Sequence, residues 1–251
     1  MSAKGLWQKE FNASKFKFAA GIVLPIALAI SIPYLYESLT GIMQSIPIPE
    51  FAREQVEMFK DFNYYVWFNW FGKNLFQIVG MLAIIFGAGL ISTEVSRKTV
   101  YFLLTKPISR QQVFAVKYLT SLASLEAIVV ISTIVLYLSV SATGHSLPVI
   151  KLTQNGIMAI AGFALIYSIA VYFSTVFDQA LKSALVSFLI VVLLSVPNFV
   201  TSFRPLSLYY QMTGLSIYKG EGFPYIPLLV IAAVTAAIYK LAEKRFVRSD
   251  F

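Results

Sequence analysis

The sequence has few charged residues and no cysteine. Only 13% of its 251 residues are charged, while 58% are hydrophobic and the mean hydropathy is +0.74. A soluble domain carries about 25% charged residues, because water must wet its whole outer surface. The shortage of charge therefore indicates that lipid surrounds most of the chain. The lack of cysteine excludes disulfides, thiolate metal sites and cysteine nucleophiles.

The side chains that catalysis needs are also scarce. The chain has one histidine, His145, and only one acid, Glu126, lies well inside an apolar run. An intramembrane protease or a lipid transferase needs His, Asp or Glu gathered at one depth. No G-x-x-x-x-G-K-[ST] loop is present, and the run Gly87-Ala88-Gly89 is expected to serve close helix packing instead. We therefore expect no catalytic residue, no metal site and no cofactor in this chain.

What the sequence has is long apolar runs. A membrane-spanning helix needs about 20 mostly apolar residues. Six runs qualify, at about residues 18–36, 75–91, 113–140, 156–177, 183–200 and 224–241. Residues 1–16 place aromatic side chains among lysines, which predicts an interfacial helix, although a basic flank that only sets topology is an alternative. The predicted fold class is an all-α membrane protein with six transmembrane helices in one domain, residues 1–251.

The distribution of positive charge predicts the orientation. The net charge is +8, but the cations cluster at the ends of apolar runs, and no zinc knuckle or RNP-like motif suggests nucleic acid. Six spans put both termini on one side. Fourteen of the 20 lysines and arginines fall on that side and five on the other, with Lys73 at a boundary. Because cations mark the cytoplasmic face, we expect a multi-pass protein of the cytoplasmic membrane with both termini inside.

Two long stretches fall on the opposite, outer side. Residues 37–63 contain two prolines followed by a segment of mixed charge, which predicts a short helix within residues 50–62. Residues 201–223 are rich in glycine and tyrosine. They form either short helices that dip back into the membrane, where protein or water must cover the backbone, or an ordinary surface loop.

The cytoplasmic crossing between the second and third spans carries the functional argument. The second span ends near an acid, and a basic pair then leads into a short amphipathic segment, residues 99–105, which is closed by a proline and followed by an arginine. Such a segment predicts a short helix across the mouth of the bundle, whose apolar side chains pass motion from a soluble partner into the membrane. The candidate coupling residues are Glu94, Arg97, Lys98, Thr99, Val100, Phe102, Leu103, Pro107 and Arg110.

This ordered set resembles the permease subunits of ABC-2 type transporters, the six-span, type V exporter-like class. In that family the second span typically ends in an acid, a Gly/Arg–Thr-like step enters the coupling helix, and a Pro–hydrophobic–Ser–Arg stretch precedes a lysine early in the third span. The matching residues here are Glu94, Lys98-Thr99, Leu103-Leu104, Pro107-Ile108-Ser109-Arg110 and Lys117. Lys98 departs from the glycine that usually precedes the threonine. The basic-aromatic tail, residues 244–250, is similar to the tails of these permeases.

The resemblance implies a half-transporter that pairs with a second permease copy, identical or related, and docks a separate ABC subunit that binds ATP and Mg²⁺. The leading hypothesis is export of amphipathic peptides or hydrophobic antibiotics. The alternatives are an ion or a lipid/glycan exporter permease, or a non-transporting immunity or assembly protein in the membrane. Membrane lipids are expected partners in every case, and nucleic acid in none.

Glu126 is a further candidate. It follows Lys117 by nine residues, which at 1.5 Å per residue places it about 14 Å deep, near the bilayer midplane. A carboxyl group at that depth is costly and is a functional candidate: it could line the translocation route, bind a cationic group or take up a proton. The alternative is a protonated side chain hydrogen-bonded to Ser121, Ser124 or a neighbouring span.

Overall fold

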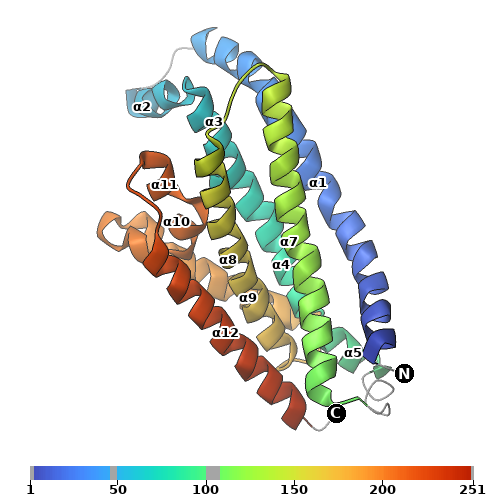
Figure 1. Cartoon of the computed structure of the whole chain (residues 1–251). Helices are drawn as coiled ribbons and strands as arrows, with labels where there is room; N and C mark the ends of the chain where they lie inside the picture. The colour runs from blue at the N-terminus through green and yellow to red at the C-terminus, as the bar shows by residue number, and fades with distance from the viewer. Residues whose placement is uncertain (1–2, 46–49, 100–107, 250–251) are drawn as a thin grey trace.

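The computed structural model describes residues 3–45, 50–99 and 108–249, and all regular structure within these ranges is helical (Figure 1). The α-helices are α1 (Ala3–Ser45), α2 (Glu50–Phe59), α3 (Phe62–Asn69), α4 (Leu75–Ala88), α5 (Ser92–Ser96), α7 (Arg110–Ala142), α8 (Val149–Ser174), α9 (Ala180–Ser195), α10 (Leu208–Thr213), α11 (Leu215–Lys219) and α12 (Tyr225–Arg248). Three shorter turns complete them, the π-helical η1 (Trp70–Asn74) and the 3₁₀ turns η2 (Val196–Phe199) and η3 (Thr201–Leu206).

Six helices of the described chain are long and apolar enough to cross a membrane, which confirms the predicted fold class. They cover Gly5–Ile42, Phe62–Ala88, Arg110–Ala142, Val149–Ser174, Ala180–Phe199 and Tyr225–Arg248. The second span begins at Phe62 rather than near residue 75, because α3 continues through η1 into α4. Asn74, Gln77 and the aromatic-rich residues 64–71 obscure this start in the sequence. The asparagine amides are satisfied inside the helix, since Asn69 donates to the Tyr65 carbonyl at 2.9 Å and Asn74 to the Asn69 carbonyl at 2.8 Å.

The first span is a single helix of 43 residues, about 65 Å long at 1.5 Å per residue. The residues predicted to form an interfacial helix are helical, but they run into the span without a break, so they are not a separate element. One face of this end, Leu6, Glu10 and Ser14, is buried, while Trp7 and Phe11 stay exposed. The spacing of four residues places the three buried side chains in one row along the helix. This row packs against the rest of the bundle.

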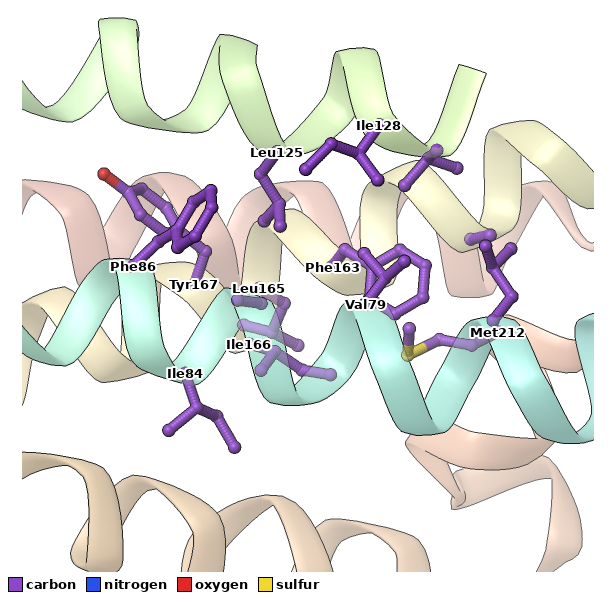
Figure 2. Packing of buried hydrophobic residues seen from close by; sticks show 14 of the residues in the cluster. Val79, Ile84, Phe86, Leu125, Ile128, Phe163, Leu165, Ile166, Tyr167 and Met212 are labelled. Carbon is purple, nitrogen blue, oxygen red and sulfur yellow. The ribbon is translucent and has the colours of Figure 1, made fainter. Parts of the chain in front are cut away.

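Helix α8 lies at the centre of the bundle and contacts α4, α7, α9, α10 and α12. Figure 2 shows Val79 of α4, Leu125 of α7 and Phe163 of α8 in one cluster of buried side chains. The approach of α4 to α8 is close at Gly87, where a Cβ atom would lie 2.7 Å from the Tyr167 carbonyl oxygen. The packing role predicted for this small residue is therefore confirmed.

Both of the long stretches predicted for the outer side contain short helices. The first contains α2, as predicted for residues 50–62. The second lies between α9 and α12, and its α10 enters the bundle: Met212 fills the space beside Gly162, thirteen residues or about 20 Å into α8. The Trp67 indole also donates to the Thr213 carbonyl at 2.8 Å. Protein covers the backbone of α10, as the re-entrant alternative for this segment requires.

The spans differ in how much of their surface the bundle covers. In the most apolar stretch of α8, 61% of the residues are buried, against 17% for α9 and 11% for α12. Such apolar surface is stable in lipid but not in water. Helices α9 and α12 therefore present their free faces to lipid or to another chain. Figure 1 shows that both termini lie at the same end of the bundle, together with α5.

Candidate functional site

A buried lysine joins three helices at the end of the bundle that carries the termini. Lys117 of α7 is 4% exposed. Its Nζ lies 2.8 Å from Glu94 Oε1 of α5 and 3.1 Å from Glu10 Oε1 of α1. We call Glu10, Glu94 and Lys117 the ion-pair cluster. It connects the short helix that leads into the predicted coupling segment with two membrane spans.

The cluster is close to electrically balanced. Lys17, about two turns further along α1 than Glu10, interacts electrostatically with all three of its members. Two carboxylates thus share a buried space with two ammonium groups. Removing charges from water is costly unless each has a partner, so removal of one member would leave another uncompensated.

Glu94 has a second partner beyond the end of α5. The Thr99 hydroxyl donates to the Glu94 carboxylate, while Lys117 holds the other carboxylate oxygen. Burial by itself raises the pKa of Glu94, but the charge of Lys117 and the hydrogen bonds from Lys117 and Thr99 outweigh it, so the pKa lies below its ordinary value. Glu94 is therefore an anion at neutral pH.

The turn between α5 and Thr99 contains the residue that departs from the family pattern. Lys98 has φ of 58°, in the left-handed region that glycine adopts without strain. Glycine is the residue that usually stands here in the permeases that the sequence resembles. Lys98 adopts this conformation although its Cβ makes it unfavourable.

The remaining predicted coupling residues divide into three groups. Arg97 is exposed at the end of α5. Arg110 is not part of the ion-pair cluster, because its Nη1 donates to the carbonyl oxygens of Val247 at 3.1 Å and Ser249 at 2.7 Å, which ties the start of α7 to the C-terminal segment. The third group lies outside the described residues and comprises Val100, Phe102, Leu103 and Pro107.

Sequence reasoning missed Glu10 as a member of the site. It is the only acid among the first 36 residues, where four lysines surround it. An isolated acid in a basic segment is a signal for a specific partner, but the partner is 107 positions away in sequence. Lys117 was noted only as part of the family pattern, and the structure makes it the centre of the site.

Glu126 of α7 is not part of this cluster. Both of its carboxyl oxygens are buried, and neither has a hydrogen-bond partner among the described residues. The predicted bonds to Ser121 or Ser124 are absent from the described structure, and the Ser124 hydroxyl donates to the Thr120 carbonyl at 3.0 Å instead. Tyr118, two turns earlier on α7, interacts electrostatically with it. A buried polar group without a partner is unfavourable, so Glu126 keeps its status as a functional candidate.

Comparison with known proteins gives one finding. A family model described as "ABC-2 family transporter protein" matches residues 48–250. The match contains α5, Lys117 and Glu126, but it begins after α1 and so leaves Glu10 outside. No curated protein matches the chain.

Proposed function

Because this chain belongs to the ABC-2 family of transporter proteins, it is a membrane permease component, and we propose that it forms half of an ATP-driven exporter. A second copy, or a related permease, supplies the other half. The family consists of membrane transport components rather than enzymes, so ATP and Mg²⁺ belong to a separate ATP-binding subunit. The chain itself needs no cofactor under this proposal.

The observation that carries the proposal is the position of Lys117. It lies between Glu94 of α5, which leads into the predicted coupling segment, and Glu10, near the start of the first span. Thr99 is hydrogen-bonded to Glu94, so the first residue of the segment is already part of this network. When the ATP-binding subunit moves the segment, the ion-pair cluster transmits the displacement to α7 and α1 together.

The orientation of the exporter follows from charge. Most lysines and arginines lie at the end of the bundle that carries the termini, which favours a cytoplasmic location for that end. The ATP-binding subunit would then meet the coupling segment from inside the cell. Since the sequence has no cysteine, a single Ser96→Cys substitution at the exposed end of α5 can be labelled alone. Labelling from the outer side of intact cells would refute the orientation and the mechanism with it.

The cargo that we favour is an amphipathic peptide or a hydrophobic antibiotic. The described segments beyond the spans are short helices, which suit a small cargo better than a large polymer. Glu126 favours a translocation route that also accommodates a positively charged group, because an unpaired carboxyl near the midplane can accept a proton or a cationic group. The alternatives are an ion, a lipid or a glycan as cargo, or a non-transporting immunity or assembly role. Turnover measured with each class of compound distinguishes the cargoes, and turnover with none of them indicates the non-transporting role.

The direct test is co-purification with the candidate ATP-binding subunit, followed by cargo-stimulated ATP hydrolysis in lipid. We expect Phe102→Ala and Leu103→Ala each to abolish the stimulation. The matched control is Phe199→Ala, since Phe199 is 85% exposed and lies in η2, beyond the end of α9. If stimulation survives in both coupling variants, the contact with the ATP-binding subunit lies elsewhere.

A further inference from the structure

Two cavities meet along the least covered side of the bundle. The larger has a volume of about 720 Å³, lies among α8, α9, α10 and α12, and is lined almost entirely by apolar side chains. The smaller, of about 400 Å³, lies at the end of α12 and is lined by Lys244, Arg245 and Arg248. Tyr172 and Leu241 line both, so an apolar groove continues directly into a cationic pocket.

The positive charge of the pocket is not neutralised within the described part of the chain. None of its three cations lies within 4.0 Å of a described carboxylate, and the nearby Glu243 is paired with Lys240 at 2.9 Å. Arg245 also donates through Nε to the Thr175 carbonyl at 3.1 Å, which fixes the end of α12 against the end of α8. A fixed cluster of cations beside an apolar groove attracts an anion that carries a hydrocarbon chain.

We infer that this site binds an anionic phospholipid, with the phosphate among Lys244, Arg245 and Arg248 and an acyl chain in the groove between α9 and α12. Basic pockets between transmembrane helices are a recognised form of headgroup binding. The groove volume lies within the range of about 300–1,000 Å³ that is usual for ligand pockets.

The length of the groove also suits an acyl chain. From Leu241 to Ile226 it follows fifteen residues of α12, which is about 22 Å. One leaflet of hydrocarbon is about 15 Å thick, so the groove is long enough to hold an acyl chain along its whole length.

Charge argues against a second copy of the chain as the occupant. A symmetric contact between two copies places the same surface patches against each other. Along this groove it would bring the pocket cations of both copies together, and no described carboxylate of the same copy lies within 4.0 Å of them. The inference rests on this geometry alone and does not depend on transport or on which face is cytoplasmic.

The test uses the full chain with Val234→Cys, which places one fluorescent label in the groove about 10 Å from Leu241. The labelled protein is reconstituted in phosphatidylcholine vesicles that contain brominated phosphatidylglycerol or brominated phosphatidylcholine at equal mole fraction. We expect brominated phosphatidylglycerol to quench the fluorescence of the label more effectively than brominated phosphatidylcholine does. Since each cation near a headgroup contributes about fivefold, Lys244→Gln/Arg248→Gln should lower this lipid preference about 25-fold.

Three controls make the result decisive. Lys15→Gln/Lys182→Gln removes the same charge from exposed positions that line neither cavity, and should leave the preference unchanged. Val230→Trp fills the groove without touching the cations and should abolish the preference. Equal quenching by the two lipids, or a preference that survives Val230→Trp, would overturn the inference. Efficient disulfide formation between two copies of the unlabelled Val234→Cys variant would overturn it as well, by assigning the groove to the second copy.

Discussion

Replacement of Lys117 by methionine measures how strongly the ion-pair cluster holds the bundle together. The side chains of Lys117, Glu10 and Glu94 are only 5%, 11% and 22% exposed. At an effective dielectric constant of about 20, contacts of this length have a gross attraction of about 5–6 kcal/mol each, most of which desolvation offsets. Removal of one partner leaves buried charge uncompensated and costs about 3–5 kcal/mol. We expect the free energy of unfolding to fall by that amount.

The matched control is Lys60→Met. Lys60 Nζ lies 2.6 Å from Glu57 Oε1, but these side chains are 55% and 66% exposed, so the pair contributes about 0–1 kcal/mol. For a chain of this size, 1 kcal/mol corresponds to about 2–4 °C in the thermal midpoint. Lys117→Met should therefore lower the midpoint in detergent by about 6–20 °C, and the control by at most about 4 °C.

A rescue variant separates buried charge from lost packing. Lys117→Met combined with Glu10→Gln leaves one negative charge, Glu94, and one positive charge, Lys17, and should recover most of the lost stability. If Lys117→Met and Lys60→Met have the same midpoint, the cluster is not a buried ionic contact, and the proposed path from the coupling segment to α7 and α1 fails.

Three further predictions concern Lys98, Glu94 and Glu126. Lys98→Gly should raise the free energy of unfolding by about 0.5–1 kcal/mol, because removing the strain of a Cβ in the left-handed conformation outweighs the greater freedom of glycine in the unfolded chain. Lys98→Ala keeps the Cβ and should show no gain in the thermal midpoint. Although burial raises the pKa of Glu94, Lys117 and Thr99 hold it below its usual value. The stabilisation that the Glu94 carboxylate contributes is therefore complete above the unfolded-state pKa of about 4.3 and is lost only as the pH falls through the lower folded-state pKa. Midpoints measured from pH 7 to pH 3 should accordingly show a loss below about pH 4 that Glu94→Gln reduces and Glu57→Gln does not. Glu126→Leu should raise stability by about 1–3 kcal/mol, since the unpaired carboxyl disappears, and should stop cargo turnover; full turnover in this variant would exclude Glu126 from the route.

Hydropathy was sufficient to predict the spans, because in lipid the length of an apolar run decides whether a helix can cross. It failed at the start of the second span, where Asn74, Gln77 and the aromatic-rich residues 64–71 obscure the boundary. The amides of Asn69 and Asn74 bond to carbonyl oxygens of their own helix, a local arrangement that an average over a window does not detect. Residues 3–16 show the same limit, since composition predicted the helix but not its continuation into α1.

The candidate site was predicted in part. The acid at the end of the second span and the later lysine belong to a recognisable pattern, but their contact depends on how α5 and α7 pack. Glu10 required knowledge of the α1–α7 contact, which no local spacing contains. The entry of α10 into the bundle likewise depends on a fit between Met212 and Gly162 that is not visible in either segment alone.

The unbroken length of α1 has a mechanical consequence for communication across the membrane. One end of this helix holds Glu10 against Lys117, and beyond its middle the Tyr36 hydroxyl donates to the Lys60 carbonyl next to α2. A tilt imposed at the first contact must reach the second, except where the helix bends at Pro25 or Pro33. A spectroscopic probe at exposed Tyr34 would thus report, from one side of the bilayer, on an event at the other.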